Sequence, residues 1–167
     1  LIYEFSGSRN LKTNPLNVTG LDGDKWDYMI EVSIVGDSTL YNYLKPTFNN
    51  DSSSNYRHYN MVALASSAGA EVEDSKPRLD LGSYIYNTDK PSVCRYKVTG
   101  TSSEERYIDV FAGGDRNANA GTRVSKKSLY WKNTADNLTS MQFPSQESAN
   151  INVTLRIYQI PKKANLD

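Results

Sequence analysis

The stretch Ile151-Asn-Val-Thr-Leu-Arg-Ile-Tyr-Gln-Ile160 decides the fold class of this chain. Its first four aliphatic residues occupy every second position, with polar side chains between them. A period of two places alternate side chains on opposite faces of an extended chain, so this segment is predicted to be a strand with one buried face. Residues 26–34 repeat the pattern, with Tyr28, Ile30 and Val32 among the apolar positions.

Shorter and less regular strand-like segments fill most of the remaining sequence. Polar segments rich in Gly, Asn, Asp and Ser separate them, and these residue types favour tight turns. No segment shows a convincing helical period, although residues 62–69 allow a short helical turn as an alternative. We therefore predict an all-β fold, an antiparallel β-sandwich of jelly-roll type with about eight to ten strands. The further strands are expected at 1–5, 39–48, 56–65, 78–86, 93–98, 106–111, 128–133 and 138–143.

The domain organisation is expected to be simple. The chain has 167 residues and shows no internal repeat or break in composition, so residues 1–160 are predicted to form a single domain. Residues 161–167 carry no pattern and are predicted to be a flexible tail. The longest apolar stretches are far shorter than the roughly 20 residues of a membrane span, so membrane insertion is not expected.

The charge and the reactive side chains limit the function. Nineteen basic residues balance nineteen acidic ones, which gives no basic footprint for nucleic acid. Cys94 and His58 are the only residues of their kinds, so we expect no intrachain disulfide, no metal site rich in His or Cys, and no cofactor. The carboxylates that merit attention as glycosidase residues are Glu31, Asp80 and Asp109, but no catalytic group is predicted and the chain is not expected to be an enzyme.

Aromatic and amide side chains give the main hint of a binding function. Twelve tyrosines and two tryptophans suit the stacking of sugar rings, although tyrosines also favour ordinary strand positions. If a glycan binds, the predicted contacts are Asn55, Tyr56, Arg57 and His58, where a polar loop leads into a strand. The alternative for this loop is a tight polar turn whose side chains cap their own backbone.

Five segments, taken in order, resemble a family of tailed-bacteriophage virion proteins. The match spans residues 15–160. One departure is at the end, where the family often has Tyr-Gly-Ile and this chain has Tyr158-Gln-Ile160. The matching segments are Gly-Leu-Asp-Gly-Asp (20–24), the strand 26–35, Asn-Asp-Ser-Ser-Ser-Asn-Tyr (50–56), Trp-Lys-Asn-Thr-Ala with Leu-Thr-Ser (131–135 and 138–140), and Arg-Ile-Tyr-Gln-Ile (156–160).

The resemblance implies a non-enzymatic structural component of a virion: a tail fibre, an appendage or a capsid decoration. Its partners would be other virion proteins and further copies of itself, with a trimer favoured, and host-surface glycans would be a further partner in receptor binding. Its location would be the virion, after assembly in the host bacterial cytoplasm, and a chain with a single Cys agrees with folding there. The alternative is a stand-alone carbohydrate-binding or adhesin module of a cellular organism.

Overall fold

The computed structural model describes residues 1–36, 44–64, 67–79, 91–115, 122–145 and 150–162. These residues contain no helix, and therefore none long and apolar enough to span a membrane. The strands that run through them are β1 (Tyr3–Asn10), β2 (Leu16–Thr19), β3 (Trp26–Gly36), β4 (Thr47–Phe48), β5 (Tyr56–Leu64), β6 (Ser67–Lys76), β7 (Ser92–Thr99), β8 (Arg106–Asp115), β9 (Thr122–Trp131), β10 (Ser140–Phe143) and β11 (Asn150–Pro161).

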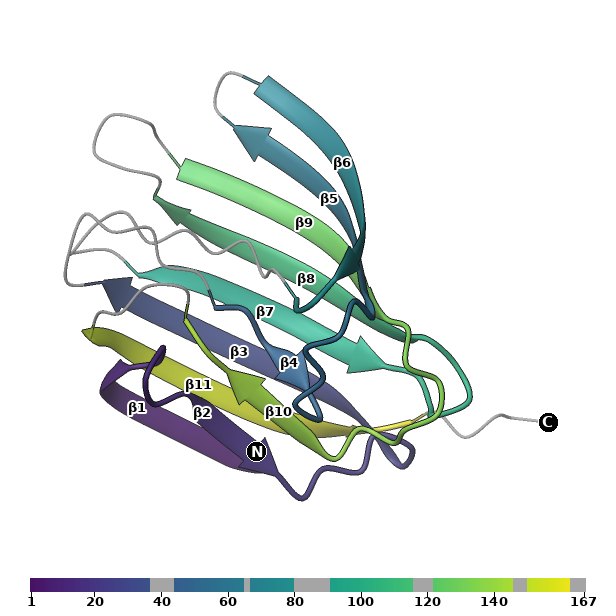
Figure 1. Ribbon diagram of the computed structural model, residues 1–167. Coiled ribbons are helices and arrows are strands. Elements are labelled where there is room, and N and C mark those ends of the chain that lie inside the picture. Colours follow the sequence, from purple (N-terminus) through teal and green to yellow (C-terminus); the bar gives the residue numbers. More distant parts are fainter. Residues whose placement is uncertain (37–43, 65–66, 80–90, 116–121, 146–149, 163–167) are drawn as a thin grey trace.

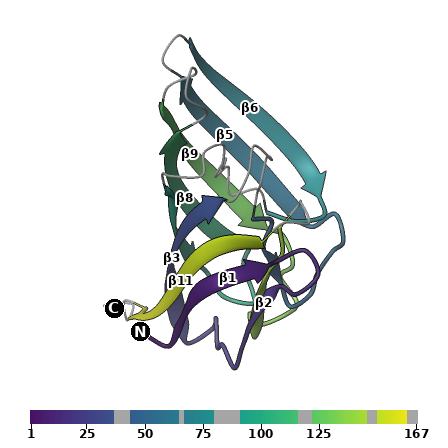
Figure 2. The same ribbon diagram turned by 90° about the vertical axis from the view of Figure 1, so that its left-hand side faces the viewer.

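The strands form two unequal antiparallel sheets (Figure 1). The large sheet has eight strands in the order β1-β11-β3-β7-β8-β9-β5-β6, and the small sheet has three in the order β2-β10-β4. The small sheet lies over the half of the large sheet that contains β1, β11 and β3, while β5 and β6 extend away from it (Figures 1 and 2). The predicted all-β antiparallel sandwich is confirmed.

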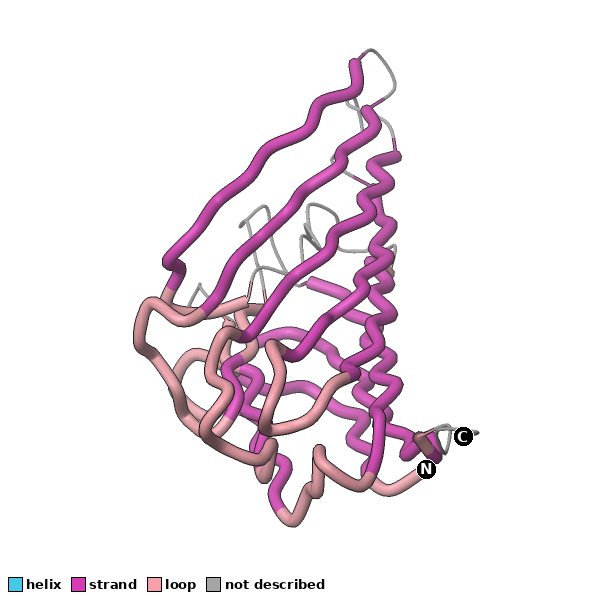
Figure 3. The backbone as a smooth tube through the Cα atoms, turned by 90° about the vertical axis from the view of Figure 1, so that its right-hand side faces the viewer, coloured by secondary structure: helices cyan, strands magenta, loops and turns pink. Residues whose placement is uncertain are grey.

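The period of two places the core between the sheets. On β11 the four alternating aliphatic residues are at most 2% exposed, and their counterparts on β3, including Ile30 and Val32, are equally buried. The small sheet contributes Phe48, Met141 and Phe143 to the same core. Burying each such side chain contributes roughly 1.5–3 kcal/mol. The outer face of the large sheet has no second layer among the described residues (Figure 3).

Several element predictions need correction. The strands β2 and β6 were not predicted, because β2 has only four residues and β6 (Ser-Ala-Gly-Ala-Glu-Val-Glu-Asp-Ser-Lys) is poor in strand-forming residues. The alternative of a helical turn over 62–69 is wrong, since β5 ends and β6 begins there. A low strand propensity is tolerated in β6 because it is an edge strand.

Other predictions are met only in part. Of the expected strand 39–48, only Thr47 and Phe48 form one, and residues 37–43 lie outside the described part of the chain. Of the expected strand 78–86, residues 80–86 lie outside it as well. Strand β11 continues through Pro161, which pairs with Trp26, so the predicted tail begins one residue too early. Residues 163–167 of that tail are not described.

Candidate functional site

The turns that carry the family resemblance meet at one end of the sandwich, around Arg106. Its side chain is 1% exposed. The guanidinium donates hydrogen bonds to the carbonyls of Gly23 (3.1 Å) and Gly100 (2.6 Å) and to the carboxylate of Asp24 (3.0 Å). A Cβ on Gly23 would lie 2.6 Å from the Cβ of Leu138, so only glycine fits where this turn passes. One buried cation thus joins turns that are distant in the sequence.

The turn after β4 is fixed to Trp131 through Asp51. The indole Nε1 donates to Asp51 Oδ2 at 2.7 Å, and the Asn55 amide donates to the same oxygen at 3.0 Å. The backbone and hydroxyl of Ser53 donate to Oδ1. Burial raises the pKa of Asp51, but the hydrogen bonds outweigh burial and hold the pKa below its ordinary value.

Asn49 joins two of the turns by its side chain. Its backbone has a φ of 50°, in the left-handed region that Asn tolerates better than most residues. Its Oδ1 accepts hydrogen bonds from the backbone of Thr139 (2.8 Å) and of Ser140 (3.0 Å), and its amide donates to the carbonyl of Asn137 at 2.6 Å. The Asn137 amide donates to Asp22, and this bond is the main cause of the lowered pKa of Asp22.

We call this set of turns, 20–25, 49–55, 100–105 and 132–139 together with Arg106, the loop end. The polar side chains described above are all bonded within the chain. In the acidic turn 22–27, Asp22 accepts hydrogen bonds from Asn137 and from backbone amides, and Asp24 accepts them from Arg106 and Ser102. Among the described residues, no group of three His, Cys, Asp or Glu could hold a metal ion.

The four predicted glycan contacts, Asn55, Tyr56, Arg57 and His58, do not share one face. Tyr56 is fully buried, and its hydroxyl is bonded to the backbone of the preceding turn. Burial raises its pKa well above the ordinary value. His58 is 2% exposed, and its Nε2 lies 3.0 Å from the carbonyl oxygen of Arg78. Both side chains point toward the interior because they occupy alternate positions of β5, which matches the strand predicted at 56–65.

Arg57 lies on the opposite face of β5 and is partly exposed. Its guanidinium pairs with Asp74 at 3.3 Å and with Glu105 at 3.9 Å, and Asp74 raises its pKa. Since successive side chains of a strand alternate, a ligand on the surface can touch Arg57 without touching its two neighbours. The prediction that these residues bind a glycan stays a prediction.

The outer face of the large sheet has rows of cross-strand neighbours that the sequence does not reveal. One row holds long side chains, and the next row holds short ones. The long row is Glu4, Arg156, Glu31, Arg95, Phe111, Lys126 and Met61, on β1, β11, β3, β7, β8, β9 and β5. The short row is Ser6, Thr154, Ser33, Val93, Gly113 and Val124, from β1 to β9.

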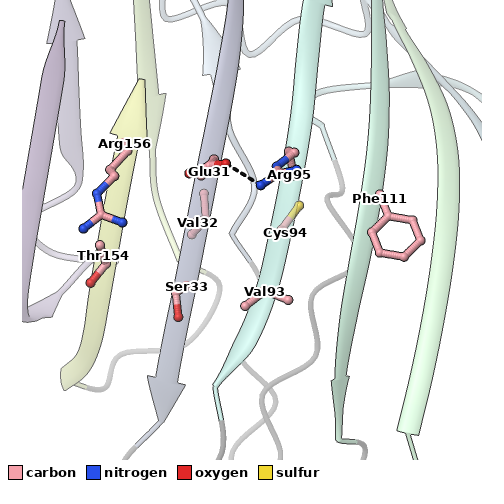
Figure 4. A pocket seen from close by; sticks show the side chains of 9 residues that line it. All are labelled: Glu31, Val32, Ser33, Val93, Cys94, Arg95, Phe111, Thr154 and Arg156. Carbon is pink, nitrogen blue, oxygen red and sulfur yellow. Dashed lines mark ion pairs between the residues drawn. The ribbon is translucent and has the colours of Figure 1, made fainter. Parts of the chain in front are cut away.

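The step between these two rows forms a hollow of about 380 Å³, which we call the open-face hollow. Figure 4 shows its side chains on β11, β3, β7 and β8, with Arg156 toward one side and Phe111 at the other. The core residues Val32 and Cys94 complete the floor. The lining residues are Glu31, Val32, Ser33, Val93, Cys94, Arg95, Phe111, Thr154 and Arg156.

The open-face hollow combines charged pairs with an exposed aromatic ring. Glu31 and Arg95 form an ion pair of 2.6 Å, drawn as the dashed line in Figure 4. Arg156 pairs with Glu4 at 2.7 Å, and that hydrogen bond raises the pKa of Arg156. The Arg95 side chain is 66% exposed and Phe111 is 57% exposed. The guanidinium of Arg95 and the ring of Phe111 are therefore accessible to a ligand.

The tyrosines divide between the two faces of the large sheet. Tyr28 and Tyr96 are buried in the core, where burial raises their pKa values. Tyr59, Tyr107 and Tyr130 lie on the outer face of β5, β8 and β9, with Tyr130 5.7 Å from the first ring and 5.3 Å from the second. The number of tyrosines in the sequence therefore exceeds the number available to a ligand, because several of them are buried in the core.

The residues of the open-face hollow were not predicted as a site. Glu31 was singled out as a strand carboxylate, but its neighbours come from strands that begin at Ser92, Arg106 and Asn150. No local pattern joins them, because they meet only through strand pairing. The signal that could have found them is a charged residue in the outward positions of each neighbouring strand, once the strand order is known.

A second hollow of about 540 Å³ lies beside the small sheet. Hydroxyl, amide and proline side chains line it, with Arg78 as its charged residue and no aromatic ring. It lacks the apolar surface that accompanies polar groups in most small-molecule sites. The lining residues are Thr47, Asn50, Ser52, Pro77, Arg78, Gln142 and Pro144.

No protein-family model matches the chain, and no curated protein matches it. Among solved structures, congerin II with bound lactose and MES has 12% identity and a TM-score of 0.42, over 87% of this chain and all of that one. The Caenorhabditis elegans galectin LEC-6 has 8% identity and a TM-score of 0.36, over 93% and 95% of the two chains. At these values the similarities assign neither a family nor a ligand to this chain.

Proposed function

We propose that this protein is a carbohydrate-binding β-sandwich module that holds a sugar in the open-face hollow. The observation that carries the proposal is the exposed ring of Phe111 beside the Glu31–Arg95 ion pair, above a floor of short side chains. The assignment rests on the chemistry of these groups.

A sugar ring matches this surface in two ways. Its C–H face packs against an aromatic ring, which the accessible face of Phe111 provides. Its hydroxyl groups both donate and accept hydrogen bonds, and the Glu31–Arg95 pair offers guanidinium donors beside a carboxylate acceptor. An exposed ion pair contributes little to folding stability, so its members can exchange some mutual contact for contacts with a ligand.

The test is binding of the purified protein to an array of glycans that end in common neutral and acidic sugars. We expect saturable binding that is lost in F111S and at least about tenfold weaker in R95A. M61S is the matched control for the aromatic site, because Met61 is 58% exposed on the same face but lies outside the hollow. K12A is the control for the loss of one exposed positive charge. Binding that is absent, or equally weakened by the controls, would falsify the proposal.

A second candidate is a structural role in a tailed-bacteriophage particle, which is compatible with the first. The observation in its favour is that segments of the resemblance contact one another at the loop end. For example, Trp131 donates to Asp51, and Asn137 donates to Asp22. The resemblance thus concerns residues that hold turns of the fold in place, which supports a shared architecture.

The virion role predicts self-association. Light scattering at several concentrations is expected to give the mass of a stable trimer, because particle appendages are symmetric assemblies. A monomer at all concentrations would argue against this role and leave the glycan-binding proposal intact. Binding of the protein to purified particles that lack it would test the virion partners directly.

A further inference from the structure

We infer that the glycan is an internal stretch of a linear chain of several sugars, lying across the strands in a trough that extends the open-face hollow. This inference rests on the proposed function. It specifies the ligand as a polysaccharide segment, as opposed to a single terminal sugar.

The first observation is the length and direction of the short row. The register aligns its members across β1, β11, β3, β7 and β8. Neighbouring strands lie about 4.8 Å apart, so the four intervals span ~19 Å. The long row runs beside it over the same strands, and four of its members, on β11, β3, β7 and β8, form a wall of the hollow. Thr154, Ser33 and Val93 line the hollow itself, and we extend the trough floor to Ser6 and Gly113 at its two ends.

The second observation is the change of chemistry along the trough. At the β1 end the hydroxyls of Ser6 and Thr154 lie 3.1 Å apart and can exchange this bond for bonds to a sugar. The middle carries the charged groups of the wall. Toward the β8 end, Val93 of β7 is 49% exposed and Phe111 of β8 offers its ring. A single sugar can contact only one of these groups of side chains, whereas a chain of sugars can contact all three.

The third observation is that neither end is closed among the described residues. Strand β1 is an edge of the large sheet, so the trough opens there past Ser6. At the other end the row continues to Val124 on β9, which is 40% exposed. A trough open at both ends accepts the interior of a chain, while a pocket for a terminal sugar is closed on one side.

The experiment measures affinity against chain length by calorimetry. The probes are glucose, N-acetylglucosamine and their β-1,4-linked oligomers up to the hexamer, together with α-1,4-linked glucose oligomers. For at least one series we expect the affinity to rise by about tenfold or more from the single sugar to the hexamer. The variant S6Y, which places a ring across the β1 end, is expected to remove this gain and leave the affinity for the shortest binding sugar unchanged.

Two further variants locate the effect. S33Y fills the middle of the trough and is expected to weaken binding of every length. I2Y is the control, because Ile2 precedes β1 and lies on the side of the wall away from the trough. This variant is expected to change nothing. Equal affinity for all lengths, or a gain that survives S6Y, overturns the inference and leaves the proposed function standing. Binding of none of these sugars overturns the inference, and the proposed function is then decided by the glycan array.

Discussion

The loop end and the open face of the large sheet use the same residue types in opposite ways. Arg106 is 1% exposed and bonded to three carbonyls and a carboxylate, whereas the Arg95 side chain is 66% exposed and pairs only with Glu31 among the described ion pairs. Trp131 is fully buried with its indole bonded to Asp51, whereas Phe111 is 57% exposed. A polar side chain bonded within the protein stabilises the fold, and one that faces water is accessible to a ligand.

The resemblance to virion proteins reaches both regions. Three of the five segments that resemble virion proteins contribute turns to the loop end, and the other two, 26–35 and 156–160, lie in β3 and β11. The open-face hollow takes Glu31 and Arg156 from those two strands, and it adds Arg95 and Phe111 from strands outside the resemblance. The comparison predicts that mutations at the loop end act on stability and that mutations in the hollow act on binding.

The largest expected effect is that of R106M. It leaves the carbonyls of Gly23 and Gly100 without this donor and removes the partner of Asp24, which costs about 3 kcal/mol of unfolding free energy. R95M, the same change on the open face, is expected to cost at most about 0.5 kcal/mol. Urea denaturation monitored by tryptophan fluorescence measures both. Similar losses would remove the distinction between the two regions.

W131F is expected to have the next largest effect. It removes the hydrogen bond from Nε1 to Asp51 and part of a buried ring that lies against Phe48 at 5.5 Å, at a cost of about 2 kcal/mol. Its thermal midpoint should fall, while glycan affinity at temperatures where it is folded should equal that of the wild type. A loss of affinity in the folded variant would place the ligand at the loop end.

Acidification should weaken the loop end. The pKa values of Asp51 and Asp24 are lower in the folded protein than in the unfolded chain. Their contribution is therefore complete above the unfolded-state pKa of about 4 and is lost as the pH falls through the lower folded-state values. Denaturation from pH 7 to pH 2 should show D51N less stable than the wild type at pH 7 and less sensitive to acid. Parallel profiles would contradict this role of Asp51.

The smallest effect on stability is expected for F111S. Phe111 is mostly exposed, so its unfolding free energy should stay within about 0.5 kcal/mol of the wild type. The same variant is expected to lose glycan binding. A stability loss of several kcal/mol would show that the ring belongs to the core and would weaken its assignment to the ligand.

The sequence predicted the strands whose inner residues form the core, because burial of one face imposes a period of two. It missed β6, where an edge position relaxes the demand for strand-forming residues, and β2, which is too short to show a period. It also grouped Tyr56 and His58 with Arg57 as contacts for one ligand, although the alternation of β5 turns Tyr56 and His58 inward. Glu31, Arg95 and Phe111 come together only through strand order and register, which no local pattern encodes.

The most direct measurement is a map of backbone and indole NMR shifts during titration with a glycan that binds. The amides of Ser33, Arg95 and Phe111 are expected to shift with the ligand, while the indole N–H of Trp131 stays in place. Shifts concentrated at Trp131 and Asn55, with the open-face amides unchanged, would contradict the separation of a stabilising loop end from a binding open face.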